Sequence, residues 1–260
     1  MTSPHVHVPY EKIGDYLQFI RENRLNLEIY FSSATLDTMD SAALQRLKED
    51  LSHNPSLSFH APFMDLCPGA VDTKIRAVTM ERFSRVLDVA ALLKPKCIVF
   101  HSGYEKWKYA HNVYLWLEKS LETWQPLLTT AKGLGVKIAI ENIFEEEPSN
   151  LRLLMEKLAS DYFGICFDAG HCNLFSKLPL HAWLDELKSY IIELHLHDND
   201  KSADQHLPIG DGDIDFSTLF AEMKGRDCIH TIETHTPERV LKSLDRLKNF
   251  GIGKDGRGSA

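Results

Sequence analysis

The sequence predicts a single (β/α)8 barrel. Eight short apolar segments alternate with eight segments whose apolar residues recur at helical spacing, which is the order of elements in such a barrel. An open, doubly wound sheet would show the same alternation, but no Gly-x-Gly-x-x-Gly turn follows any strand, and the count of eight favours closure. The chain of 260 residues, 43% of them hydrophobic, can bury a core of this size. We expect one barrel over residues 1–252, followed by a flexible polar tail over residues 253–260.

Each expected strand is a short run of apolar residues in which β-branched and aromatic side chains are frequent. The first three read HVHV, LNLEIYF and LSFHAPF, and the fourth, CIVFH, ends at a Ser-Gly pair. The fifth, sixth and eighth read VKIAIEN, FGICFD and IHTIE, and the seventh runs from Ile191 to about His195. The other seven cover residues 5–8, 25–31, 57–63, 97–101, 136–142, 163–168 and 229–233.

Apolar residues spaced three and four apart mark the helix that follows each strand. The last helix is expected to open at Thr236-Pro237, with the threonine hydroxyl as N-cap and proline at the first helical position. The other helices are expected within residues 10–24, 44–51, 71–93, 113–132, 151–158, 180–187 and 216–223. The helix expected within residues 71–93 has one apolar stripe, made of Ile75, Val78, Val86, Leu87 and Ala90.

The composition argues against nucleic acid and membrane as partners. The net charge is −8 and the pI is near 5.9, so the chain as a whole does not attract polyanions. No apolar run approaches the roughly 18 residues of a membrane span, and the first residues lack the apolar core of a secretory leader. The five cysteines are odd in number and unclustered, which is typical of reduced thiols. We expect a cytoplasmic protein.

Residues that can bind metal ions stand at the carboxyl ends of the expected strands, where such a barrel carries its active site. In the seventh strand His195 and His197 alternate with Leu194 and Leu196, so both imidazoles point to one face. Imidazole and carboxylate bind zinc and similar cations, and four carboxylates on one rim would repel one another without a cation. The candidate metal ligands are His60, His101, Glu141, Asp168, His171, His195, Asp204, His206 and Glu233.

Five segments resemble the xylose isomerase-like TIM barrels, the superfamily of endonuclease IV (AP endonuclease family 2) and of the sugar phosphate isomerases and epimerases. These segments are IAIEN (138–142), CFDAGH (166–171), ELHLHDND (193–200), DQHLPIGDGDIDF (204–216) and TIET (231–234). The resemblance covers nearly the whole chain. It implies a divalent metal cofactor, zinc or manganese, with one to three ions bound.

The two branches of this superfamily imply different roles for the nine residues. The resemblance to the isomerases and epimerases implies one ion held by Glu141, Asp168, His195 and Glu233. In that branch Glu141 and Glu233 would also be the catalytic pair that exchanges the substrate proton. The resemblance to endonuclease IV implies two further zinc ions, one at His60, His101 and a bridging Glu141, the other at His171, Asp204 and His206.

The surroundings of these residues favour the isomerases. Proton transfer beside a carbonyl needs one metal ion and two carboxylates, whereas phosphodiester cleavage needs further ions to activate water and neutralise the phosphate. The complete set of nine favours hydrolysis, but the loop FSSATLDTMD after the second strand has no arginine. The acidic run 145–147 would also repel a phosphate backbone.

We therefore predict a metal-dependent isomerase or epimerase of a small sugar or sugar phosphate. The alternative is a zinc-dependent phosphodiesterase similar to endonuclease IV, acting on abasic DNA or another phosphoester, and a third is a non-catalytic metal- or sugar-binding barrel. His197 and Lys201, which follow the seventh strand, are candidates for substrate contact or for orienting the ligating imidazoles. Trp107, in a basic and aromatic loop after the fourth strand, is a candidate for substrate contact. The sequence does not predict an oligomeric state.

Overall fold

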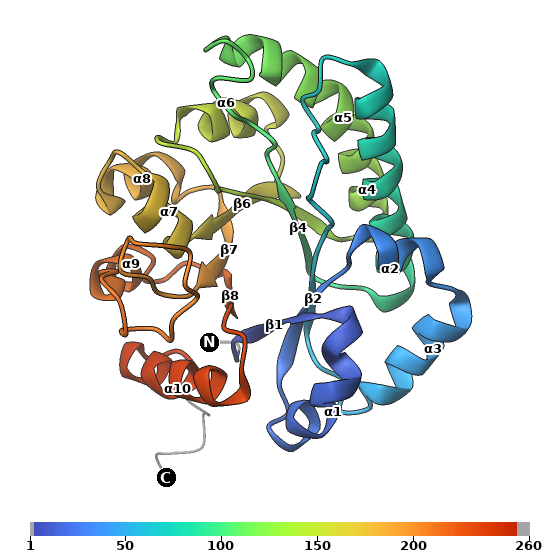
Figure 1. Ribbon diagram of the computed structural model, residues 1–260, viewed down its shortest axis with the longest axis vertical. Coiled ribbons are helices and arrows are strands. Elements are labelled where there is room, and N and C mark those ends of the chain that lie inside the picture. Colours follow the sequence, from blue (N-terminus) through green and yellow to red (C-terminus); the bar gives the residue numbers. More distant parts are fainter. Residues whose placement is uncertain (1–2, 254–260) are drawn as a thin grey trace.

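Eight parallel strands close into a barrel in the order of the chain, from β1 to β8, with the helices outside them (Figure 1). The structure is a computed structural model that describes residues 3–253. The predicted (β/α)8 barrel is therefore confirmed. Its strands are β1 (His5–Pro9), β2 (Asn26–Tyr30), β3 (Leu57–His60), β4 (Cys97–His101), β5 (Lys137–Glu141), β6 (Phe163–Asp168), β7 (Ile191–Leu196) and β8 (Ile229–Ile232).

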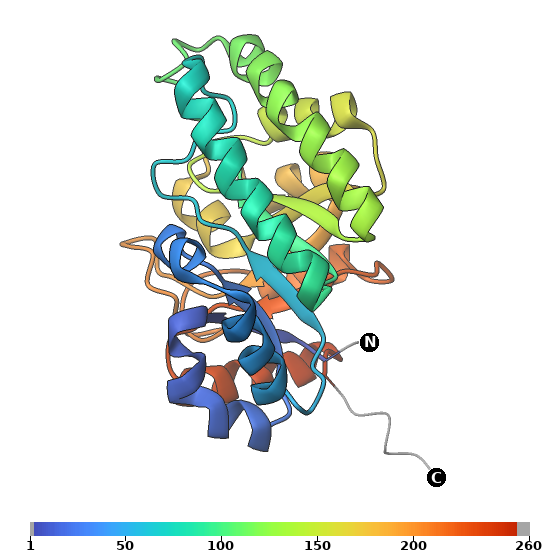
Figure 2. The same cartoon turned by 90° about the vertical axis from the view of Figure 1, so that its right-hand side faces the viewer.

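The helices pack around the barrel, and the two longest, α4 and α5, lie side by side (Figure 2). As predicted, the Thr236 hydroxyl accepts a hydrogen bond from the Arg239 N–H and Pro237 opens α10. The α-helices are α1 (Ile13–Glu22), α2 (Ser33–Thr38), α3 (Ser41–Asp50), α4 (Thr73–Leu93), α5 (Val113–Leu134), α6 (Ser149–Leu158), α7 (Ala169–Phe175), α8 (Leu180–Leu187), α9 (Phe216–Glu222) and α10 (Pro237–Leu247). The short 3-10 helices are η1 (Tyr10–Lys12) and η2 (Lys248–Phe250).

The register of the strands aligns their carboxyl ends. His101 at the end of β4 is paired with Glu141 at the end of β5, and Asp168 at the end of β6 is paired with His195 in β7. Pairing of β1 with β8 closes the barrel. Because parallel strands all end at one mouth, the polar residues that terminate them become neighbours.

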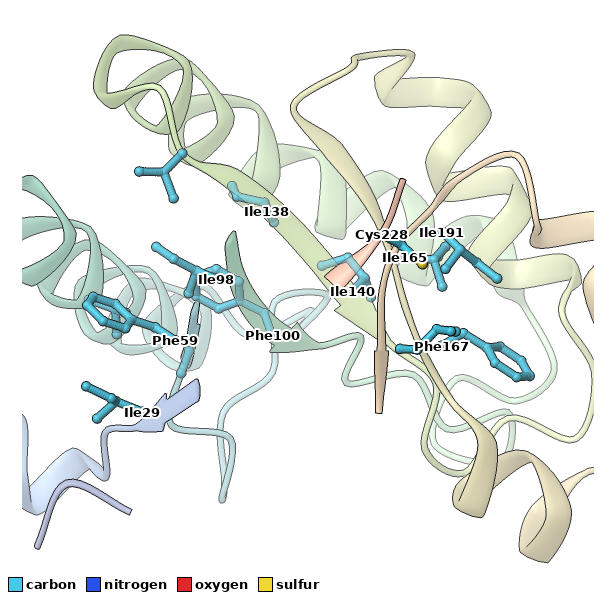
Figure 3. Packing of buried hydrophobic residues seen from close by; sticks show 14 of the residues in the cluster. Ile29, Phe59, Ile98, Phe100, Ile138, Ile140, Ile165, Phe167, Ile191 and Cys228 are labelled. Atoms are coloured by element: carbon cyan, nitrogen blue, oxygen red, sulfur yellow. The ribbon is translucent and has the colours of Figure 1, made fainter. Parts of the chain in front are cut away.

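Alternation along the strands separates two kinds of buried side chain. Large apolar residues such as Phe100 and Phe167 belong to the main core (Figure 3). They face the helices, where Phe100 packs against Trp124 and Phe167 against Trp183. A separate, smaller cluster is formed by Cys97, Val99, Ala139 and Cys166 on β4 to β6. Polar residues of the intervening positions share the interior with this cluster, which leaves room for a cavity at the mouth.

The structure corrects two details of the prediction. Helices α2 and α7 were not predicted, because six or seven residues carry too few apolar positions to show a helical period. The apolar stripe of α4 was wrong at its start, since Ile75 and Val78 are 50% and 51% exposed. Ile75 lines the central cavity, so the first turns of α4 reach the mouth rather than the core.

The described residues end at Gly253, so the rest of the expected tail lies outside them. Over residues 3–253 no helix combines the length and the apolar character that a membrane crossing requires. The five cysteines are buried and carry free thiols.

Candidate metal centre

The strand ends bring all nine predicted residues to one mouth of the barrel. A cavity of about 860 Å³ opens there, within the size range of small-molecule sites. Asp168 and His195 lie beneath its surface and are fully buried. The other seven residues line the cavity and are His60, His101, Glu141, His171, Asp204, His206 and Glu233.

His195 points into a ring of three carboxylates. Its Nδ1 lies 3.6 Å from Glu141 Oε1, 3.8 Å from Asp168 Oδ2 and 3.7 Å from Glu233 Oε2. The side chain is completely buried, and Nδ1 makes no hydrogen bond to any residue in the described part of the chain. A buried nitrogen without a partner is costly unless another species satisfies it.

Electrostatics show that this centre demands positive charge. Burial alone would lower the pKa of His195, but nearby acidic groups, among them Glu28 and Glu233, hold it well above its usual value. Burial alone would raise the pKa of the Glu141 carboxyl, but the imidazoles of His195 and His101 hold it well below its usual range. A bound cation would satisfy these carboxylates in the same way as a protonated imidazole.

Glu141 lies between the central ring and a second group of ligands. Its Oε2 is 3.0 Å from His60 Nε2 and 3.2 Å from His101 Nε2, while Oε1 faces His195. His60 Nδ1 donates a hydrogen bond to the Ala61 carbonyl at 2.9 Å, and its Nε2 lies 3.0 Å from Glu141 Oε2, where a bound cation would take the place of a ring proton. Glu141 would therefore supply one oxygen to each of the two groups.

A third group gathers around Asp204. Its Oδ2 is 3.5 Å from His171 Nε2 and 3.2 Å from His206 Nε2. Burial alone would lower the pKa of His206, but the carboxylates of Asp204 and Glu233 raise it to about 9. This group therefore also brings imidazole nitrogens and carboxylate oxygens face to face.

The loop that carries Asp204 and His206 is fixed by the buried carboxylate of Asp198. This carboxylate accepts hydrogen bonds from the N–H groups of Gly210, Gly212 and Ile214, at 2.8 to 3.2 Å. A side chain at Gly212 would meet the Asn199 carbonyl at 2.4 Å. His206 itself has a φ of 46°, a conformation that non-glycine residues seldom adopt, so the loop holds it in place.

Asp168 is positioned from two sides. The side chain of Asn142 bonds both the N–H and the carbonyl of Asp168, each at 2.9 Å. The Nε2 of His197 lies 3.2 Å from Asp168 Oδ2. A Cβ on Gly170 would come within 2.0 Å of the His197 ring, which explains the glycine in the AGH segment.

The donors and distances fit a divalent cation. Ligand atoms bound to one ion at about 2.0–2.2 Å lie roughly 3–3.5 Å from one another. The separations around His195 Nδ1 exceed this by only a few tenths of an ångström, and the partnerless nitrogen is the atom that an ion would satisfy. Imidazole and carboxylate donors together suit zinc, manganese and related cations.

The structure separates the three residues predicted to contact substrate. His197 is completely buried and stacks on His206, with 3.8 Å between the ring centroids. It therefore packs behind the predicted ligands Asp168 and His206 and does not line the cavity. Lys201 is exposed and does not line the cavity. Trp107 is 75% exposed and lines a neighbouring pocket of about 370 Å³. Residues such as Tyr104 and Phe144 line both this pocket and the central cavity.

The sequence left open the roles of two residues beside the central ring. Glu28 on β2 is completely buried and contacts His195, and His7 on β1 lines the cavity beside Glu233. Neither stands in a metal-binding motif. The only available signal was a charged residue in the middle of an apolar strand, LNLEIYF, and the sequence left open which face that residue takes.

A family model described as "Xylose isomerase-like TIM barrel" matches residues 14–250. The chain belongs to the xylose isomerase-like TIM barrel family. Curated relatives in Methanocaldococcus jannaschii carry the names uncharacterized protein MJ1311 and MJ1614. The first is 30% identical over 202 residues, covering 74% of this chain and 68% of the relative. The second is 27% identical over 241 residues, covering 91% and 90%.

Three solved structures resemble the chain along nearly its whole length. A D-tagatose 3-epimerase-like protein shows a TM-score of 0.82 at 26% identity, covering 95% of this chain and 96% of that one. The TTHB071 protein of Thermus thermophilus, from a crystal soaked with ZnCl2, shows a TM-score of 0.81 at 27% identity, with both chains fully covered. A D-psicose 3-epimerase, at 12% identity and a TM-score of 0.72, shares the fold.

Proposed function

We propose that this chain is a divalent-metal-dependent isomerase or epimerase of a small sugar or sugar phosphate. The observation that carries the proposal is the buried, partnerless Nδ1 of His195, ringed by the carboxylates of Glu141, Asp168 and Glu233. Two of these carboxylates, Glu141 and Glu233, also line the cavity where a substrate would lie. The name of the D-tagatose 3-epimerase-like structure supports the same class of reaction.

Glu141 and Glu233 would be both metal ligands and the acid/base pair. A bound cation would polarise the substrate carbonyl and offset the negative charge that develops when the neighbouring C–H bond breaks. One glutamate takes the proton from carbon, and the other, which carries a proton at the start, delivers it to the opposite face in an epimerase. In an isomerase the proton is delivered to the adjacent carbon, and the proton of the neighbouring hydroxyl moves to the former carbonyl oxygen. Asp168 and His195 hold the ion without meeting the substrate, because neither lines the cavity.

The cavity walls suit a small polyhydroxylated molecule. Imidazoles and carboxylates at its base can bond hydroxyl groups, and apolar side chains such as Phe63, Met64 and Phe144 cover its rim. Trp107 would contact a substrate that extends into the neighbouring pocket. We propose that His197 orients Asp168 and does not contact the substrate directly.

The test is exchange of substrate hydrogen with solvent. Metal-loaded protein is incubated in deuterated water with ketoses and their phosphates, and the recovered sugars are analysed by NMR and mass spectrometry. We expect deuterium at one carbon of a substrate and formation of its isomer or epimer. Binding of sugars without exchange in any of them would indicate the non-catalytic barrel instead.

A second candidate is a zinc-dependent phosphodiesterase. The groups around His60 and His101 and around Asp204 favour it, because a one-ion isomerase does not require them. His206→Ala separates the two functions: it should spare sugar exchange by a one-ion enzyme and abolish cleavage by a three-ion enzyme. Cleavage of abasic-site DNA or of a simple phosphodiester by the wild-type protein, lost in His206→Ala, would put this function first.

A further inference from the structure

Glu28 is a completely buried carboxylate in the middle of β2, beside the metal centre. Each of its two oxygens meets an imidazole. Oε2 lies 3.1 Å from His195 Nε2, and Oε1 lies 2.8 Å from His7 Nδ1. An ionised carboxylate only accepts hydrogen bonds, so both facing ring nitrogens carry the proton.

These two hydrogen bonds determine which nitrogen of each imidazole is left for other partners. With Nε2 donating to Glu28, the neutral ring of His195 must present the lone pair of Nδ1, and Nδ1 is the atom that faces the three carboxylates. With Nδ1 donating to Glu28, the ring of His7 retains its other nitrogen for the cavity that it lines. His7 Nδ1 is also 3.2 Å from Glu233 Oε1, so Glu28 is linked to a second proposed ligand.

We propose that Glu28 is the positioning residue of this metal centre, fixing the orientation and tautomer of His195 directly and tying Glu233 to the same frame through His7. The inference rests on the metal site proposed above, but it does not depend on which reaction the site performs. Without Glu28, the His195 ring could rotate about its Cβ–Cγ bond or place its proton on Nδ1, and either change removes a ligand.

The barrel supplies a matched control for this proposal. Glu193 on β7 is also completely buried, and its carboxylate lies within 4.8 Å of the nearest carboxylate oxygen of Glu28 and ring nitrogen of His195. Its Oε1 accepts hydrogen bonds from the hydroxyls of Ser58 at 3.0 Å and Thr231 at 2.6 Å, and it makes no hydrogen bond to a proposed ligand within residues 3–253. Replacing either carboxylate by its amide keeps the size and shape of a buried side chain, but only Glu28→Gln alters a hydrogen bond to a proposed ligand.

The experiment measures metal affinity. Wild-type protein, Glu28→Gln and Glu193→Gln are stripped with a chelator and titrated with Co²⁺ and Zn²⁺ by calorimetry and by the visible absorption of bound Co²⁺. We expect Glu28→Gln to bind about 10–100-fold more weakly, the usual effect of losing a partner that orients a ligand, and Glu193→Gln to stay within about twofold of the wild type. Affinity in Glu28→Gln within twofold of the wild type, or an equal loss in both variants, would overturn the proposal.

A second measurement avoids the risk that Glu28→Gln does not fold. In zinc-loaded wild-type protein labelled with ¹⁵N-histidine, long-range NMR spectra report which ring nitrogen carries hydrogen. We expect the proton of His195 on Nε2 and that of His7 on Nδ1, and a proton on Nδ1 of His195 would contradict the proposal. If no sugar shows exchange but the affinity difference is found, the proposed reaction fails and the role of Glu28 stands.

Discussion

At the scale of single residues, Glu233 carries the greatest weight in the proposed reaction. It lines the cavity, faces His195 Nδ1 and would move a proton at the reacting carbon. Because a positioned acid or base contributes about 10²–10⁴-fold, we expect Glu233→Gln to lower the rate of sugar exchange by at least that factor. The measurement is deuterium uptake, with Glu105→Gln as control, since Glu105 is an exposed carboxyl on the same cavity wall. Undiminished exchange in Glu233→Gln would remove Glu233 from the mechanism.

Glu145 gives a prediction about stability and pH. Burial raises the pKa of its carboxyl, although hydrogen bonds from the Ser102 hydroxyl and the Ile143 N–H act in the opposite direction. The folded state therefore holds this proton more tightly than the unfolded state, and the resulting stability is lost as pH rises through the raised pKa. Denaturant titrations should show the wild type losing stability relative to Glu145→Gln as pH rises from about 4 to 7.

The control for that comparison is Glu147→Gln, an exposed carboxyl of the same loop. The free energy of unfolding of Glu147→Gln should change with pH in parallel with that of the wild type. A constant difference between wild type and Glu145→Gln would show that the carboxyl of Glu145 is not protonated preferentially in the folded state.

The nine candidate ligands could be read from the sequence because each stands at a strand end or in a short motif. Glu28 and His7 could not, because their role arises from contacts with His195, which lies 167 residues from Glu28 in the chain. A one-dimensional pattern shows the end of a strand, but it does not show which interior residue lies behind a ligand.

At the scale of elements, the loop between β7 and α9 decides whether the third group of ligands can form. Gly212→Ala would place a methyl group 2.4 Å from the Asn199 carbonyl and 2.5 Å from Asp198 Oδ1, which displaces the loop that carries Asp204 and His206. We expect this variant to keep the central ion and, if the wild type binds an ion at the Asp204 group, to lose that ion, as measured by metal content and crystallography.

Gly133→Ala is the matched control for Gly212→Ala. Gly133 lies within α5, and a Cβ there has no neighbour within 4 Å. This change should leave the metal content unaltered and raise the free energy of unfolding by up to about 1 kcal/mol. Equal metal content in the two variants would show that the conformation of the β7–α9 loop does not control the third group.

The eight strands were predicted because each combines an apolar run with a turn signal. This pattern identifies a strand even when its predicted boundaries are wrong by a few residues. The short helices α2 and α7 depend instead on local capping, by the side chains of Ser32 and Asp168. The exposure of Ile75 and Val78 depends on where α4 begins relative to the barrel mouth. Periodicity reports which face of a helix is apolar, but not which of its turns the core covers.

At the scale of the whole molecule, the cluster of carboxylates links metal binding to stability. A cation that binds only the folded state, present at about 100 times its dissociation constant, stabilises it by about 2.7 kcal/mol. For a chain of this size that corresponds to a rise in Tm of roughly 5–10 °C. Thermal unfolding of chelator-treated protein with and without Zn²⁺ or Mn²⁺ should show this rise, and Ca²⁺, which prefers oxygen ligands, should give a smaller one.

The metal content per chain tests the central claim most directly. Protein purified without chelators or added metal is analysed for its elements, and the same protein is analysed after incubation with Zn²⁺ or Mn²⁺. We predict at least one tightly held divalent ion per chain, lost in Glu233→Gln; about one ion supports the isomerase or epimerase, and about three would favour the phosphodiesterase. No bound ion after incubation with either metal would contradict the account.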